Sequence, residues 1–226
     1  MLGFTLSKLN LLIFVIAVFS IVSYFLVAFE NNATTKIALD LVKLQSSDAY
    51  SIITSDSLCD SKETLLPNSL SPDASARSNS YYVLKISKTE TIETLEELTQ
   101  TKTKIVFAVA KRKTQNELVS ASSINVSGKV YLFNYQTGGV PRMVLVDETD
   151  EQNNSAIFDP QAEIRSNKIV LIKEVIAGEN HTYFIPCSTE NDSDNCKYFR
   201  EKAMEALNDL PEFDRDTTTE TGGFKC

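Results

Sequence analysis

The sequence predicts an α+β fold in which a long N-terminal transmembrane helix continues into an extracellular antiparallel β-sheet domain with a short C-terminal helix. Three observations lead to this prediction. Residues 11–29 carry no charged side chain. No proline or glycine interrupts the chain between Gly3 and Pro67, and β-branched and aromatic runs separated by polar turns follow residue 80. We therefore divide the chain into a membrane-anchor or assembly helix (1–29), a helical extension (30–56) and an extracellular α+β domain (57–226).

The apolar run at residues 11–29 is long enough to cross a membrane. Fourteen of its side chains are Leu, Ile, Val or Phe. As a helix it spans about 28 Å, close to the thickness of a bilayer's hydrocarbon. A cleaved secretory signal would be shorter and would end at small residues, whereas this run ends in Val27-Ala28-Phe29-Glu30. A core helix of a soluble protein would show a polar face, which is lacking here, so we expect a retained span.

The charges that flank the span predict its orientation. Lys8 is the only charged residue before the run, and Glu30 is the first after it. Lysine favours the cytoplasmic side, which places the N-terminus inside and residues 30–226 outside a cell membrane. The formal net charge of −8 becomes −9 for the outer part once Lys8 is removed. Such an acidic domain lacks the basic surface that nucleic-acid binding needs.

All four cysteines follow the span, in agreement with an extracellular domain. Cys187 and Cys196 stand at the ends of a short polar loop, and closing that ring removes chain entropy worth about 2.5–3 kcal/mol. This pairing leaves Cys59 and Cys226 for each other. A four-cysteine metal site is the alternative, but the sequence contains no C-x-x-C pair to build one. We expect two disulfides.

Five N-x-[ST] sequons also fit an extracellular domain. Asn32 lies closest to the membrane and is the weakest candidate. The expected N-glycosylation sites are the other four, Asn125, Asn153, Asn180 and Asn191.

Helical periodicity continues beyond the membrane run. Ile37, Leu41 and Leu44 recur on one helical face, and Val42 and Ala49 widen that stripe. One helix from about residue 4 to the low fifties is therefore expected, to lie against the sheet. The Asn31-Asn32 pair is its weakest point, because Asn favours caps and turns. Two shorter helices are predicted by similar spacings, one from Ile92, Leu95 and Leu98 and one from Phe199, Met204 and Leu207.

The remaining segments predict a loop at 57–80 and an antiparallel sheet of about six strands. Gly138-Gly139 marks one hairpin loop, and Gly178 marks a second because glycine readily takes a positive φ. The aromatic residues of the strands are expected to form the core and cross-strand pairs. The expected strands are 81–87, 104–110, 129–135, 141–146, 168–175 and 181–187.

No catalytic constellation is evident, and we expect no enzyme activity, cofactor or metal. His181 is the only histidine, which excludes His-based triads and paired-His metal sites, and we expect it to be an exposed sheet residue. The acidic residues of 147–151, with Asp192 and Asp194, lack the turn glycine of an EF-hand loop and are interpreted as solvated loops. Neither a P-loop nor a G-x-G-x-x-G motif is present. Ser-Lys nucleophile pairs have no fixed spacing and stay open.

The N-terminal residues Gly3-Phe4-Thr5-Leu6, followed by the apolar helix, resemble the N-terminus of type IV pilins and their archaeal relatives. In that family a leader peptidase cuts between Gly and Phe, which here are Gly3 and Phe4, and the apolar helix then forms the filament core. The resemblance in residues covers about the first 27 positions. The chain departs from the bacterial pattern at Lys8, where a glutamate is usual, and its leader Met1-Leu2-Gly3 has no basic residue.

The resemblance implies a filament or pseudopilus subunit that assembles with copies of itself through residues 4–29. The alternative is an anchored ectodomain that does not assemble and that binds an envelope or extracellular partner. Apolar helices gain little from meeting in lipid, whereas burying their sides against one another in an aqueous filament is strongly favourable. Membrane lipid is a partner in both interpretations.

Overall fold

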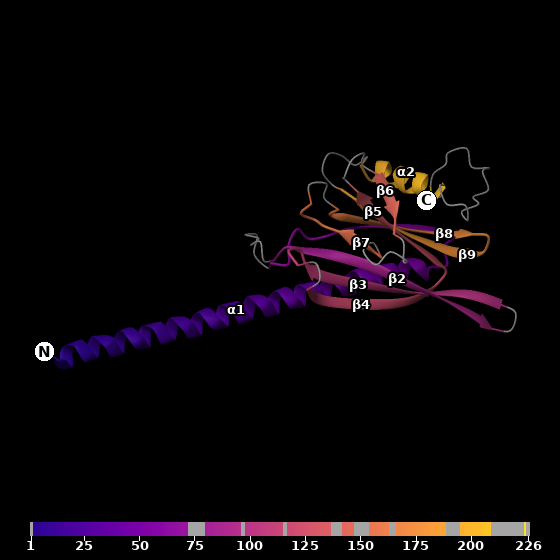
Figure 1. Ribbon diagram of the computed structural model, residues 1–226. Coiled ribbons are helices and arrows are strands. Elements are labelled where there is room, and N and C mark those ends of the chain that lie inside the picture. The colour runs from indigo at the N-terminus through magenta and orange to yellow at the C-terminus, as the bar shows by residue number, and fades with distance from the viewer. Residues whose placement is uncertain are drawn as a thin grey trace.

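The computed structural model shows one long helix that projects from a two-sheet domain (Figure 1). The structure describes residues 2–71, 80–95, 98–114, 117–136, 142–146, 154–162, 166–188, 195–208 and 224. Helix α1 (Leu2–Ile53) is 52 residues long, and its C-terminal part lies along the sheets. The prediction of an α+β chain with a long apolar N-terminal helix is confirmed.

Helix α1 runs through the Asn31-Asn32 pair without a break, so the predicted weak point does not interrupt it. The hydroxyls of Thr34 and Thr35 donate to the carbonyl oxygens of Glu30 and Asn31, each at 2.9 Å. These threonines therefore satisfy their own hydroxyls within the helix and leave the backbone ladder in place. The absence of glycine and proline lets helical hydrogen bonding continue from the apolar half into the outer half.

Nine strands occur in the described part of the chain, more than the six expected. They form two sheets, one in the order β1-β8-β9-β5-β6 and one in the order β4-β3-β2-β7. Strands β5 and β9 pair in parallel, so the first sheet is mixed, not antiparallel throughout as predicted. The strands are β1 (Cys59–Leu65), β2 (Tyr82–Leu95), β3 (Leu98–Lys111), β4 (Leu118–Ser127), β5 (Lys129–Gln136), β6 (Arg142–Leu145), β7 (Ser155–Phe158), β8 (Lys168–Ile176) and β9 (Glu179–Cys187).

Two predictions about local structure were wrong. The segment 57–80, expected to be a loop, contains β1, which pairs with β8 from Cys59 opposite Glu174 to Leu65 opposite Lys168. In the segment 91–100, expected to be a short helix, residues 91–95 and 98–100 instead continue strands β2 and β3, with Leu95 opposite Leu98. Threonine recurs along both of these strands, and its β-branched side chain favours strand over helix.

Other predicted elements are confirmed. Strands β8 and β9 form a hairpin in which Ala177 and Gly178 take positive φ values of 51° and 84°. The C-terminal helix α2 (Asn195–Asn208) buries Phe199, Met204 and Leu207, as its spacing predicted. Strands β5 and β6 pair as expected, whereas Gly138-Gly139 lies outside the described residues.

The main core forms where the outer half of α1 meets both sheets. Small side chains let the helix approach closely, and Ala38, Val42 and Ala49 are all at most 1% exposed. Leu44, predicted to share this stripe, is instead 53% exposed, because the buried face passes through Gln45 and Ser46 on its way to Ala49. The core aromatic residues behave mostly as predicted, with Tyr82 donating its hydroxyl to the carbonyl oxygen of Pro67 at 2.8 Å. Burial, with a smaller contribution from Asp159, raises the pKa of Tyr82.

Candidate functional site in the apolar half of the N-terminal helix

The apolar half of α1 is exposed on all sides. Every large hydrophobic side chain described between Leu9 and Phe29 is at least 41% exposed, and Phe29 is 72% exposed. Monomeric soluble proteins rarely expose an apolar surface of this extent. By length and composition, α1 is able to cross a membrane. The exposed residues are Leu9, Leu11, Leu12, Ile13, Phe14, Val15, Ile16, Val18, Phe19, Ile21, Val22, Tyr24, Phe25, Leu26, Val27 and Phe29.

The few polar groups of this surface are compatible with an apolar environment. Ser20 donates its hydroxyl to the carbonyl oxygen of Ile16 at 2.8 Å. Tyr24 lies edge-to-face against Phe25, with ring centroids 6.0 Å apart. The helix satisfies its own backbone groups, which is what a lipid environment or a packed helical bundle requires. Gly3 and Phe4, the expected cleavage pair, both lie within α1.

Further along the same helix, exposure changes within about two turns. Ala38 is fully buried, and from there α1 buries one face against β4, β3 and β8. The opposite face keeps polar side chains such as Asp40, Lys43 and Ser47 exposed. One unbroken helix thus joins the exposed apolar half (Leu9–Phe29), called the rod below, to an amphipathic segment that packs on the sheets from Ala38 onward. Because the helix is continuous, the direction of the rod is fixed relative to the domain.

A disulfide fixes α2 to the end of β9. Cys187 and Cys196 are bonded with their Cα atoms 5.3 Å apart, and both are buried. Cys59 is also disulfide-bonded, whereas Cys226, its expected partner, lies outside the described residues. Phe224, two residues before Cys226, packs its ring edge against Tyr183 at 4.9 Å between centroids. The oxidised cysteines fit an extracellular domain.

We expect none of the four cysteines to react with an alkylating reagent before reduction. After Cys187→Ser with Cys196→Ser, unfolding free energy should fall by about 2.5–3 kcal/mol, because the ten-residue ring no longer restricts the unfolded chain. Mass spectrometry of alkylated chains and urea unfolding of the full chain check these two expectations. Labelling of two or more cysteines in the native protein would contradict the first.

The sequons occupy different surroundings. Asn125 is exposed on β4, and Asn32 is exposed on α1. Asn180 is half-buried at the start of β9, and the hydroxyl residue of its sequon, Thr182, is 1% exposed. Asn153 and Asn191 lie outside the described residues. Of the two expected sites that the structure describes, Asn125 is therefore more accessible to modification than Asn180.

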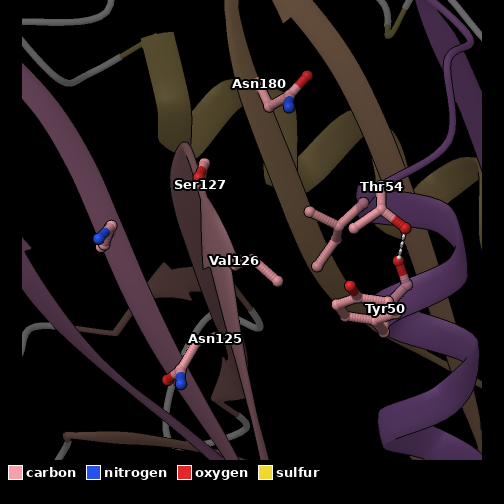
Figure 2. A pocket seen from close by; sticks show the side chains of 8 residues that line it. Tyr50, Thr54, Asn125, Val126, Ser127 and Asn180 are labelled. Atoms are coloured by element: carbon pink, nitrogen blue, oxygen red, sulfur yellow. Dashed lines mark hydrogen bonds between the residues drawn. The ribbon is translucent and has the colours of Figure 1, made fainter.

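A pocket of about 290 Å³ opens where the C-terminal end of α1 meets the sheets (Figure 2). In the close-up, Val126 points from β4 toward Tyr50. Thr54 donates its hydroxyl to the carbonyl oxygen of Tyr50 at 2.7 Å. No local pattern in the sequence indicates this pocket, because its residues come from distant segments. It is lined by Tyr50, Ile53, Thr54, Lys102, Asn125, Val126, Ser127 and Asn180.

The described residues of this lining include no carboxylate, histidine or cysteine, so they offer no carboxylate ligand for a hard metal ion. They do include a Ser-Lys pair of the kind that the sequence left open, because Ser127 lies opposite Lys102 in the β4–β3 register. Among the described residues, no group of three or more His, Cys, Asp or Glu side chains is placed to hold a metal ion. The acidic residues of 147–151, Asp192 and Asp194 lie outside the described part of the chain.

His181 is buried, which corrects the expectation of an exposed sheet residue. Its ring stacks on Tyr131 at 5.8 Å between centroids, with Nδ1 3.4 Å from the tyrosine hydroxyl. Its Nε2 lies 3.9 Å from a carboxylate oxygen of Glu179. Strand β9 lies between β8 and β5 and is covered on both faces, so alternation along its sequence does not mark an exposed side.

The apolar half of α1 is thus the feature of the described residues that most requires a functional explanation. Among the described residues, it is the long apolar stretch that the fold leaves unburied. Comparison of the chain with protein-family models, with curated proteins and with solved structures gives no match.

Proposed function

We propose that the protein is a single-pass surface protein that assembles, in the manner of a pilin, through the apolar half of α1. Its N-terminus lies inside the cell membrane, and the two-sheet domain lies outside. Membrane lipid surrounds residues 4–29 before assembly, and copies of the same segment surround them afterwards. In this proposal the outer domain forms the filament surface, and no step of its function is catalytic.

The observation that carries this proposal is the contrast in exposure along one unbroken helix. Large hydrophobic side chains from Leu9 to Phe29 are exposed on all sides, whereas from Ala38 onward one face of the helix is buried on the sheets. A helix needed only as an anchor does not have to be continuous with a core element. Continuity fixes the direction of the domain relative to the rod, which a regular assembly of identical subunits requires.

The energetics favour assembly once the rod leaves lipid. Exposed apolar surface gains roughly 25 cal/mol for each Å² removed from water. Sixteen large hydrophobic side chains between Leu9 and Phe29 are available for such burial. Within the bilayer the same contacts gain little, since lipid is equally apolar. The Gly3-Phe4 pair supports the pilin interpretation because cleavage there would leave an N-terminus that begins with the rod.

An anchored ectodomain that does not assemble is the second candidate function. The pocket between α1 and the sheets favours it, because a concave site with amide, hydroxyl and ammonium groups can bind a small polar ligand. In that case the rod serves only to hold the pocket at the cell surface.

The test separates these candidates by location and by form. Intact cells, cell membranes and material sheared from the surface are probed for the chain, and the sheared material is viewed by electron microscopy. The proposal expects outer-domain epitopes on intact cells and filaments that contain the chain. A chain confined to membranes under conditions in which other surface filaments are sheared would contradict assembly and favour the second candidate.

A further inference from the structure

The outer edge of β4 is open in the described part of the structure. Strand β4 ends the sheet order β4-β3-β2-β7, and β3 is the strand with which it pairs. Its sequence from Leu118 to Ser127, LVSASSINVS, contains no charge and no proline. Long edge strands normally carry such blocking residues, because unpaired N–H and C=O groups bind other strands. Strand β4 therefore resembles a docking strand more than a protected edge.

The register identifies the backbone groups that point outward. The backbone N–H of Gly128 donates to the carbonyl oxygen of Thr101 at 3.1 Å, which makes these opposed residues a hydrogen-bonded pair. Hydrogen-bonded and non-hydrogen-bonded pairs alternate in an antiparallel ladder. Counting back along β4, the backbone groups of Ala121, Ser123 and Asn125 therefore face away from β3. The side chains of these three residues are also exposed.

Strand β7, which forms the opposite edge of this sheet, is protected. Asn134 of β5 accepts a hydrogen bond from the backbone N–H of Ile157 at 2.7 Å and donates its amide to the carbonyl oxygen of Ser155 at 2.9 Å. The side chain thus substitutes for a neighbouring strand along β7. In the other sheet, the edge strand β1 carries charges, of which Lys62 pairs with Asp48 at 2.7 Å. The contrast makes the uncharged edge of β4 unusual within this fold.

Helix α1 and strand β4 run in the same direction. The hydroxyl oxygens of Ser46 and Ser122 are 3.1 Å apart. Ile53 lies seven residues after Ser46 on the helix, and Val126 lies four residues after Ser122 on the strand. Both line the pocket. The two advances are about 10 Å and about 13 Å, so the helix and the strand advance together. If β4 paired antiparallel with β4 of a second copy, that copy's α1 would consequently point in the opposite direction.

We propose that the edge of β4 binds a second copy of the chain in the same orientation, through residues 89–95 of that copy's β2. This inference rests on the proposed function, because a shared membrane or filament gives all copies one orientation. Strands β2 and β4 are parallel, since both pair antiparallel with β3. Strand β7 covers β2 only from Leu84 to Ser87, which leaves residues 89–95 with an open outer edge among the described strands. The two edges are different surfaces, so the contact is head-to-tail and can repeat.

Charge also favours this contact over others between copies. The chain has a formal net charge of −8, so two copies carry a net mutual repulsion. Strand β4 carries no charge, so it brings no like charge toward Glu90 of the approaching β2, which pairs with Lys88 at 2.7 Å. A parallel ladder between them would extend the sheet from one copy into the next.

The test is cross-linking of the full chain in its native membranes. One copy carries Ala121→Cys and a second, of different tag size, carries Thr89→Cys. Both positions are exposed, and a short bismaleimide is the probe. The proposal expects a cross-linked dimer when the two variants are co-expressed and none from either variant alone. A dimer from Ala121→Cys alone would indicate antiparallel β4 pairing and overturn the proposal, as would no dimer in the mixture.

A matched pair of variants tests the backbone contact itself. Ser123→Pro in the copy that carries Ala121→Cys removes an outward N–H while leaving the bonds to β3 in place, as edge strands allow. The cross-linked fraction should fall at least tenfold, whereas Ser123→Thr, which keeps the N–H, should preserve it. Equal cross-linking in both variants would overturn the strand contact. Membrane retention is measured in the same samples, so that failure of anchoring is distinguished from failure of this contact.

Discussion

Replacing Val18 and Val22 together with arginine is expected to remove the chain from membranes while the outer domain stays folded. Both residues lie in the exposed apolar half of α1. At mid-bilayer an arginine costs about 2.5–3.5 kcal/mol, so the two replacements cost roughly 6 kcal/mol. The fourteen Leu, Ile, Val and Phe residues of 11–29 together favour insertion by about 4–8 kcal/mol on the same scale. The double variant therefore loses most of the free energy that holds it in the bilayer.

Ser47→Arg provides the matched control, because Ser47 is exposed on the same helix beyond the apolar half. It should leave the chain in the membrane fraction. Cell fractionation gives the location, and resistance of the outer domain to limited proteolysis reports its fold. If the Val18→Arg, Val22→Arg chain stayed fully in membranes and in filaments, the apolar half would have neither of the roles assigned to it.

The second large effect is expected in the core, where Phe107→Ala should reduce the free energy of unfolding by about 3–5 kcal/mol. Phe107 is 1% exposed on β3, and its ring meets Phe184 of β9 edge-to-face at 6.0 Å. The contact therefore joins the two sheets. A single domain of ordinary stability has about 5–15 kcal/mol in total, so this loss leaves many molecules close to unfolding.

Pulse proteolysis of the full chain in urea measures this change without a tryptophan signal, which the sequence does not provide. Leu118→Ala is the control, since Leu118 is 60% exposed on β4, and its effect should stay within about 0.5 kcal/mol. A loss below about 1 kcal/mol for Phe107→Ala would mean that the sheets do not pack through this contact.

The sequence allowed the helices and the most apolar strands to be predicted because each has a strong local signal. The apolar run of 11–29 and the helical spacing of Phe199, Met204 and Leu207 can each be recognised from residues close together in the sequence. The hairpin at Gly178 depends on local turn chemistry in the same way.

The missed elements depend on partners distant in the sequence. Strand β1 is charged and β4 is rich in serine, and each becomes a strand by pairing with β8 or β3. The parallel β5–β9 pair joins residues about fifty positions apart, which periodicity cannot indicate. His181 was misjudged for the same reason, because its burial depends on Tyr131 from β5. The open edge of β4 and the pocket at the end of α1 follow from this tertiary arrangement.

The N-terminal residue of the mature chain tests the proposed assembly most directly. It is determined by mass spectrometry on chains from native membranes and from material sheared off the cell surface. If the subunits assemble as proposed, the chain in the sheared filaments begins at Phe4, produced by cleavage after Gly3. A chain that begins at Met1 and occurs only in membranes would contradict it, and the apolar half of α1 would then serve only as an anchor.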